Sequence, residues 1–582
     1  MMERQSYRGG NGMKKSYVFV FMILPVMLIC TAVVLKHARG PYYLCPDTEQ
    51  DYIYLISSLA LAESKPVFYT DHPGTTVQIL GAATLKIAHA LDVSDKDSLE
   101  FAVLKNPEFY LTVVNIVFIS LNALILFIVG LTAYRLTKNI GLGLLLQFSP
   151  FFSSIPLRWG LNQVSCEPLL LFTTMLFMLV LVKMIFHENL RKDACWYAGI
   201  LAVISGFGMA TKVTFAPLLM IPLIILPKLK NKAGYLILTG VSAMVWTLPI
   251  TSQYERIFKR LYLILTHTRW YGYGTYGIDA ASMQNNLQNM LTGLLYDPLT
   301  LLFFLTAVLT IIIVAGSSAA RKIAWREPSF KVLLAVIVAE LLSSFIVIKQ
   351  NAERYALPAS CLIGFLLFLQ VIYLQRRNYL RHLSAKKLTV LIMIFLVLCG
   401  AWRAHEMKGS VEERLLIKNE SLAFYRNTDN EYDNYLKVFI NVIPRSIAPS
   451  PIAALSYGNN MASHEYFHIS EISEGRFSKG LYSETLHKIY GEAYFYNLCS
   501  GEFYTWTKSF FIEDVIIRRK MNKIVFYIPP GFVKKEDIFL PCRTGSVLHL
   551  KDVSQGVYDN IYLLEGIALK AVNFEQFRFR CY

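Results

Sequence analysis

The sequence predicts a polytopic α-helical membrane protein. Of its 582 residues, 54% are hydrophobic and only 17% are charged, and a chain so long and so apolar exceeds what one soluble core would bury. The formal net charge is +16, but Lys and Arg gather in short segments between apolar runs. That pattern is typical of membrane proteins and disfavours a nucleic-acid-binding surface.

Apolar runs near the length of a spanning helix, roughly 20 residues, indicate about eleven transmembrane helices. The runs cover residues 17–35, 111–134, 140–157, 164–186, 195–211, 213–228, 233–250, 298–316, 331–348, 355–375 and 388–404. The first run has the length of a signal peptide. No small-residue cleavage site precedes the basic residues 36–39 that follow it, so we expect it to be retained as a helix.

The charges of the loops predict the orientation in the membrane. Basic segments between the spans fall on one side, which with the basic N-terminus marks the cytoplasmic face. These segments are "YRLTKN", "HENLRKD", "KLKNK", "AARKIAWRE" and "QRRNYLRHLSAKK". The loops 36–110 and 251–297 and the chain after 404 then face away from the cytoplasm.

We therefore divide the chain into a transmembrane domain, residues 1–404, and an extracytoplasmic soluble domain, residues 405–582. The second part is long enough for a small domain. It contains the strand-like segment "KIVFYIPP" and the turn-rich segment "SYGNNMAS". Together they predict a small α+β fold.

Acidic residues concentrate at the start of the first outer loop. Asp47, Glu49 and Asp51 precede the stretch 52–68, whose apolar residues recur at helical spacing, and the segment "DHPG" at 71–74 follows it. We expect the stretch to form an amphipathic helix in the membrane interface, with the acids at its start. Taken alone, acids in such a loop are equally compatible with ordinary solvated side chains.

Further ionisable residues lie at the outer ends of predicted spans, where an isolated charge is costly and tends to mark a functional site. They are Arg158, Glu167, Lys212, Glu353 and Arg354. A single Lys or Arg there is explained by snorkelling into the interface. Five such residues on one side of the membrane indicate a shared site.

These motifs resemble those of the GT-C superfamily of membrane glycosyltransferases, in the branch of the protein O-mannosyltransferases and the aminoarabinose transferase of lipid A. In that branch a catalytic acid opens the first outer loop, a His-Pro motif closes its helix, and an Arg-Tyr pair begins a late span. The matching pieces are Asp51, "DHPGTT" and Arg354-Tyr355. Glu167 and Lys212 also fit recurring positions.

The spacing supports Asp51, because 72 − 51 = 21 residues separate it from His72, similar to the acid-to-histidine distance in the O-mannosyltransferases. The chain departs from the family pattern at two points. The family usually has adjacent Asp-Glu, whereas Tyr52 follows Asp51 here, and Gly74 replaces a second proline. Asp51 and Asp47 therefore remain alternatives for the catalytic acid.

The resemblance implies transfer of a monosaccharide from a polyprenyl-phosphate donor to a lipid, glycan or protein acceptor outside the cytoplasm. We expect a bacterial inner membrane and no metal cofactor, although alternating acids at 47–51 are of a type that holds Mg²⁺ or Mn²⁺. A base on the acceptor and positive charge on the leaving phosphate are the chemical requirements. The expected roles are Asp51 or Asp47 as base, Arg354, Lys212 and Tyr355 at the phosphate, and Asp71, His72, Glu167 and Arg158 as bordering residues.

Two other function classes stay open. A transporter or flippase of a lipid-linked or envelope component would show inverted repeats and broken helices at mid-membrane, and we find neither pattern in the sequence. A membrane-anchored metalloprotease would use the HExxH motif at 464–468. That motif requires a helix, which the preceding Gly458, Asn459 and Asn460 disfavour.

The loop 267–280, "HTRWYGYGTYGIDA", alternates glycines with tyrosines. Aromatic rings suit the apolar faces of sugars, so one interpretation is a lid over the site. An aromatic belt at the membrane interface explains the same pattern.

Overall fold

Eight helices in the described part of the chain are long and apolar enough to cross a membrane, and nine if the bent pair α11 and α12 counts as one span. The polytopic helical class is thus confirmed, whereas three of the predicted runs do not form uninterrupted helices of that length. The eight are α1 (Lys15–Arg39), α5 (Pro107–Thr137), α8 (Cys166–Ile185), α9 (Leu190–Thr211), α14 (Pro298–Gly316), α16 (Pro328–Gln350), α17 (Leu357–Arg376, preceded by η6, Glu353–Ala356) and α18 (Ala385–Glu431).

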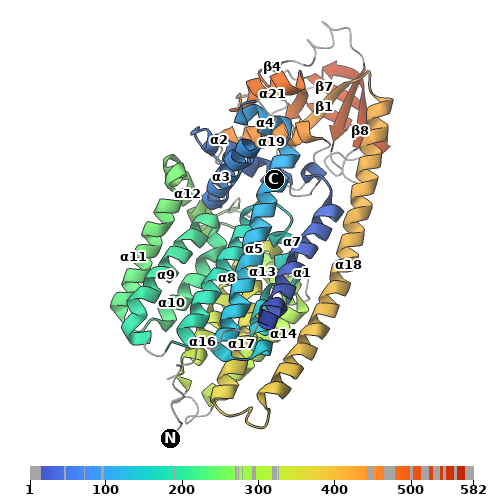
Figure 1. Cartoon of the computed structure of the whole chain (residues 1–582). Helices are drawn as coiled ribbons and strands as arrows, with labels where there is room; N and C mark the ends of the chain where they lie inside the picture. The colour runs from blue at the N-terminus through green and yellow to red at the C-terminus, as the bar shows by residue number, and fades with distance from the viewer. Residues whose placement is uncertain are drawn as a thin grey trace.

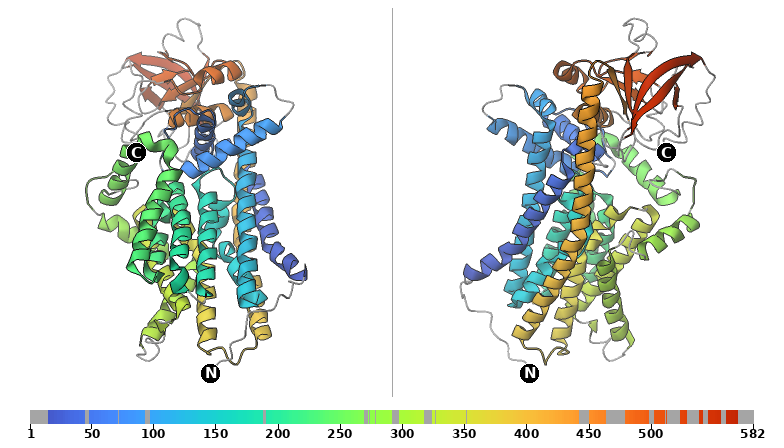
Figure 2. Two further views of the ribbon diagram at one scale, coloured as in Figure 1. Left: turned by 60° about the vertical axis from the view of Figure 1, so that its left-hand side comes forward. Right: turned by 90° about the vertical axis from the view of Figure 1, so that its right-hand side faces the viewer.

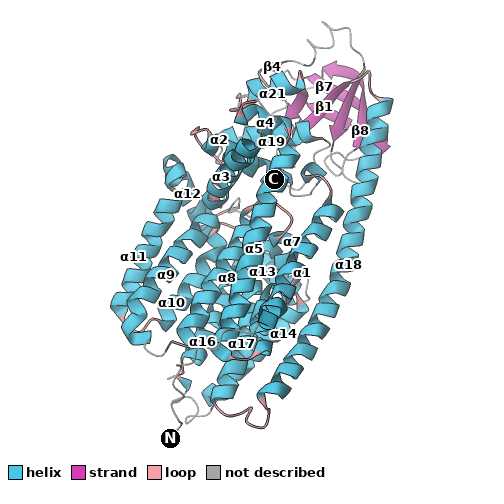
Figure 3. Ribbon diagram, viewed as in Figure 1, coloured by secondary structure: helices cyan, strands magenta, loops and turns pink. Residues whose placement is uncertain are grey.

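The structure is a computed structural model, and its helices form a bundle with a β-sheet at one end (Figure 1; Figure 3). It describes residues 15–44, 48–70, 72–92, 97–187, 190–268, 272, 274–277, 279–291, 297–316, 324–325, 327–350, 352–441, 450–463, 479–497, 502–510, 512, 523–528, 538–541, 546–555 and 560–569.

The three predicted runs that differ all contain proline. Run 140–157 becomes α6 (Ile140–Gln147), η2 (Ser149–Phe151) and α7 (Ser154–Gly160), with Pro150 in the break. Run 213–228 becomes η3 (Val213–Leu219) and α10 (Met220–Ile225), and η3 contains Pro217. Proline lacks an N–H group and clashes with the preceding turn, so it interrupts helical hydrogen bonding.

The third run, 233–250, ends early for the same reason. Helix α11 (Leu229–Trp246) stops before Pro249, and the chain turns by 89° into η4 (Leu248–Gln253) and α12 (Tyr254–Thr266). Helix α13 (Ala280–Leu291) follows in the same loop.

Helix α18 joins the bundle to the sheet. It has 47 residues, which at 1.5 Å per residue is about 70 Å and far exceeds the roughly 30 Å of the hydrocarbon core. The right-hand view of Figure 2 shows it running along the bundle and on to the sheet. The expected boundary between residues 404 and 405 thus falls within one continuous helix.

The first outer loop is mostly helical. It contains η1 (Tyr42–Leu44), α2 (Thr48–Ala62), α3 (Thr75–Leu91) and α4 (Leu99–Lys105). Helix α2 was expected to be amphipathic, but its residues from Gln50 to Ala60 are all buried. The reason is that α3 packs on one side of α2 and α19 (Pro451–Ser463), from the far end of the chain, packs on another.

The C-terminal part forms one eight-stranded mixed sheet among the described residues, in the order β4-β3-β2-β1-β5-β8-β7-β6. Strand β1 is parallel to both of its neighbours, so that Val438 is level with Tyr494 and Phe526, and the other pairs are antiparallel. The strands are β1 (Leu436–Asn441), β2 (Tyr494–Asn497), β3 (Glu502–Tyr504), β4 (Ser509–Phe510), β5 (Ile524–Ile528), β6 (Ile538–Pro541), β7 (Ser546–Gln555) and β8 (Asn560–Leu569).

The strand expected in "KIVFYIPP" is β5, and it is buried throughout. The turn expected in "SYGNNMAS" is wrong, because this segment belongs to α19. Gly458 has a packing role there: a Cβ atom at this position would lie 3.0 Å from the backbone of Tyr52. Glycine therefore allows α19 to approach α2 closely. Helix α21 (Ser483–Tyr490) lies nearby, and the Tyr482 hydroxyl donates to Glu63 at 3.1 Å.

Glu340 lies near the middle of α16 and is 2% exposed. The Oε1 atom of its carboxyl group has no hydrogen-bond partner among the described residues. Burying an unpaired polar group costs roughly 1–3 kcal/mol, so Glu340→Leu is expected to raise the thermal midpoint of the protein in lipid nanodiscs. Ser205→Ala, on α9, is the matched control. The buried Ser205 hydroxyl lies 2.8 Å from that of Tyr235, so its removal should lower the midpoint; a lower midpoint in Glu340→Leu would show that the carboxyl makes a stabilising contact.

Candidate functional site

Asp51 is held in the first turn of α2 and is 1% exposed. Its Oδ2 atom forms an ion pair with the guanidinium of Arg39, the last residue of α1. Its Oδ1 atom accepts a hydrogen bond of 2.5 Å from the backbone N–H of Val164. Arg39 also donates to the carbonyl of Asn162. The pair thus joins α1 and α2 to the segment 161–165 between α7 and α8.

The same segment leads into a second buried ion pair. Ser165 caps α8, and its hydroxyl donates to Glu167 at 2.7 Å. The other carboxylate oxygen of Glu167 pairs with the ammonium group of Lys212, and both side chains are buried. Lys212 directly follows α9, and its Nζ atom lies 4.9 Å from the ring centre of Tyr355.

The segment "HPGTT" at 72–76 positions Lys212. The carbonyl of His72 accepts from the N–H of Val213 at 3.0 Å, and Pro73 forms a β-bridge with Lys212. The Thr76 hydroxyl lies 2.7 Å from that of Thr211. This short stretch of the first loop therefore holds the end of α9, which explains why it carries hydrogen-bonding residues beside a membrane helix.

Gly74 is required at the turn into α3 on two grounds. Its φ of +73° lies in the left-handed region, which residues with a Cβ atom rarely adopt. A Cβ atom would also lie 2.3 Å from the Tyr54 hydroxyl.

Burial, and then the positive charges of Lys212 and Arg354, hold the pKa of His72 well below its usual value. The imidazole is thus neutral near pH 7.

Arg354 completes the cluster. It lies in η6 at the start of α17 and is 7% exposed. Its guanidinium carbon is 5.8 Å from the ring centres of both Trp159 and Tyr355. It also interacts electrostatically with Glu167 and His72. Two cations, one carboxylate and one neutral imidazole therefore gather where three spans end.

The structure thus brings together most of the residues that the sequence singled out. His72, Glu167, Lys212, Arg354 and Tyr355 form one cluster, and Asp51 contacts the segment that leads into it. Arg158 lies beside the cluster, where its guanidinium is 3.4 Å from Glu353. Asp47 and Asp71 lie outside the described residues.

Two participants were missed from the sequence. Arg39 looked like an ordinary basic residue after the first span, and only its pairing with Asp51 shows its place. Trp159, next to Arg158, donates its indole N–H to Glu353 at 2.9 Å. An aromatic residue beside an arginine at a span end was the available signal.

The described residues contain no cluster of three or more His, Cys, Asp or Glu able to hold a metal ion. The HExxH segment at 464–468 and Asp47 of the acidic segment lie outside those residues. Of the loop 267–280, the described part pairs His267 with Tyr276, which is 75% exposed.

No protein-family model matches this chain, and a search of curated proteins finds no match to it.

Proposed function

We propose that the chain is a membrane glycosyltransferase that transfers a monosaccharide from a polyprenyl-phosphate donor to an acceptor outside the cytoplasm. One observation carries the proposal. A buried carboxylate, Asp51, is linked through the five-residue segment 161–165 to a buried cluster that contains Lys212 and Arg354. A base next to a phosphate-binding group is what this reaction requires.

Asp51 has the properties of a general base. Arg39 and the N–H of Val164 each occupy one of its oxygens, but a carboxylate accepts about four hydrogen bonds. Its remaining lone pairs can accept the proton of an acceptor hydroxyl or amine. The acceptor oxygen or nitrogen then attacks the anomeric carbon, and the bond from that carbon to the phosphate oxygen breaks.

Lys212 and Arg354 suit the leaving phosphate. Arginine offers a planar fork of donors to phosphate oxygens, and lysine a compact positive charge. In the resting protein Glu167 pairs with Lys212, so a bound phosphate would share or displace that carboxylate. The neutral His72 and the ring of Tyr355 border the same cations.

The arrangement of the chain agrees with this proposal. The eight long helices, or nine when α11 and α12 count as one span, form the polytopic bundle that such an enzyme needs. The site then lies at the end of the bundle that carries the sheet (Figure 1), which the basic loops place outside the cytoplasm. Helix α19 packs against α2, and Gly458 approaches the backbone of Tyr52, the residue after Asp51.

Comparative mass spectrometry of lipids and cell-envelope glycans, with and without the gene, tests the proposal. We expect one glycan or lipid to lose a single monosaccharide when the gene is deleted, and to regain it when the gene is restored. The mass difference names the sugar, and the molecule that carries it names the acceptor. Identical profiles in the two strains would contradict the proposed function.

The pH dependence of transfer should report on Asp51. Burial raises its pKa to about 6, although Arg39, the Val164 N–H and Lys36 act in the opposite direction. A base works when ionised, so kcat/KM should fall as the pH drops through about 6. Arg39→Gln removes a charge that lowers this pKa, so the fall should move to higher pH. If the fall in kcat/KM stays at the same pH in Arg39→Gln, a group other than Asp51 titrates there. That group is not the His72 imidazole, because the pKa of His72 lies well below its usual value.

A further inference from the structure

We propose that Arg403, on α18, is a positioning residue for Arg354. Its guanidinium fixes the corner between η2 and α7, and this corner holds the start of α17, where Arg354 lies. This inference rests on the proposed function only in its second test, which measures binding of a donor analogue.

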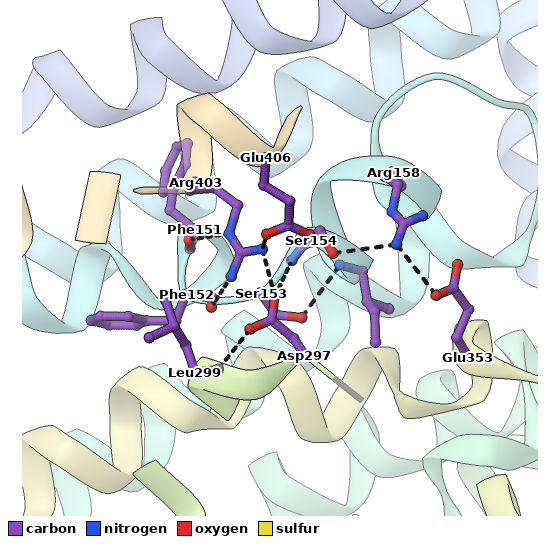
Figure 4. A network of polar contacts seen from close by, with 11 residues as sticks. Phe151, Phe152, Ser153, Ser154, Arg158, Asp297, Leu299, Glu353, Arg403 and Glu406 are labelled. Atoms are coloured by element: carbon purple, nitrogen blue, oxygen red, sulfur yellow. Dashed lines mark hydrogen bonds and ion pairs between the residues drawn. The ribbon is translucent and has the colours of Figure 1, made fainter. Parts of the chain in front are cut away.

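Arg403 is buried and contacts several groups at once (Figure 4). It forms an ion pair of 2.5 Å with Asp297, whose side chain is 1% exposed. Its Nη2 atom donates to the carbonyl of Phe152 at 2.5 Å, and its Nε atom lies 3.4 Å from the carbonyl of Phe151. It also pairs with Glu406, one turn further along α18.

The corner needs such a donor. Because the run from Ile140 to Gly160 is broken around η2, carbonyls at the break have no partner in a continuing helix, and an unsatisfied carbonyl is costly in the bundle interior. Arginine carries five N–H donors in a fixed fork. Lysine has one nitrogen, which cannot reach the same set of oxygens from one position.

Asp297 also connects this corner to a third helix, α14. Its Oδ2 atom accepts from the N–H of Ser154, the first residue of α7, at 3.3 Å, and its Oδ1 atom from the N–H of Leu299, at the start of α14, at 2.9 Å. Arg403 and Asp297 thus connect α18 and α14 to the same corner.

From the corner the contacts continue to the candidate site. Arg158 lies 3.4 Å from the Ser154 hydroxyl and 3.4 Å from Glu353, and Figure 4 shows both contacts. Trp159 donates to the other oxygen of Glu353 at 2.9 Å. Glu353 directly precedes Arg354, whose guanidinium lies over the Trp159 ring. Displacement of α7 would therefore move Trp159, which contacts Arg354, and Glu353, which precedes it.

The first test needs no substrate. Hydrogen–deuterium exchange in nanodiscs measures the backbone protection of residues 352–357. We expect faster exchange there in Arg403→Lys, which keeps a charge for Asp297 but loses the fork, and in Asp297→Asn/Arg403→Gln, which removes both charges. The control is Glu327→Gln/Arg376→Gln, because that ion pair, 2.6 Å long, lies at the opposite end of α17. Exchange as in the wild type in both Arg403 variants would overturn the inference.

The second test measures affinity for farnesyl phosphate, a short polyprenyl phosphate without a sugar. Arg403→Lys should weaken binding about tenfold. In a Glu353→Gln background the same change should weaken binding by less than a further factor of about two, because the effects of substitutions at coupled residues do not add. Equal losses in both backgrounds would make Arg403 a general structural residue and overturn the inference. If the wild type binds no farnesyl phosphate, the proposed function fails, and the exchange measurement still decides the role of Arg403.

Discussion

Asp51→Asn is expected to lower transfer by about 10³-fold while farnesyl phosphate binding stays within about twofold of the wild type. The amide keeps the shape of the side chain and removes the base. Because the phosphate contacts assigned to Lys212 and Arg354 are separate from this carboxylate, binding should persist. Transfer is measured as the amount of product that the comparative mass spectrometry identifies.

This substitution also leaves Arg39 without its buried counter-ion, so loss of activity could follow from instability. The double variant Arg39→Gln/Asp51→Asn removes both charges and separates the two effects. If Asp51 is the base, the double variant is stable and inactive. Transfer restored in the double variant would make Asp51 a structural partner of Arg39. Activity in Asp51→Asn together with an inactive Asp47→Asn would assign the base to the other acid of the same loop.

Arg354→Ala is expected to weaken farnesyl phosphate binding by about 10- to 100-fold, because a charge-assisted hydrogen bond to phosphate contributes roughly 1.5–3 kcal/mol. Arg354→Lys should restore only part of the affinity, since the charge returns without the fork. Isothermal titration in nanodiscs measures both.

The matched control is Arg376→Ala, on the same helix but at its opposite end, where the guanidinium pairs with Glu327. It should bind as the wild type does. Unchanged affinity in Arg354→Ala would remove Arg354 from the phosphate site, and an equal loss in Arg376→Ala would point to a general effect on α17.

Apolar length predicted the long spans correctly, because a helix in a bilayer must satisfy its own backbone and be apolar over its length. It did not distinguish spans from interrupted segments, although the prolines at 150, 217 and 249 were visible. In α2, helical spacing predicted the helix but not its burial on all sides. That burial depends on α19, almost 400 residues later in the chain, which no local pattern contains.

The candidate site shows the same division. Charged residues at span ends were identified because isolated charges are costly there. The partners of these charges were not predictable, since Glu167 with Lys212 and Arg158 with Glu353 join segments that only the tertiary fold brings together. The mistaken turn at residues 456–463 followed from Gly458 and its asparagine neighbours, whose helix is stabilised by tertiary packing.

A structure of the protein in nanodiscs with a bound polyprenyl phosphate tests the central claim most directly. We predict the phosphate within hydrogen-bonding distance of Arg354 and Lys212, with the Asp51 carboxylate facing the same bound molecule. A phosphate bound away from both cations, with Asp51 still enclosed between Arg39 and Val164, would contradict the assignment of this site.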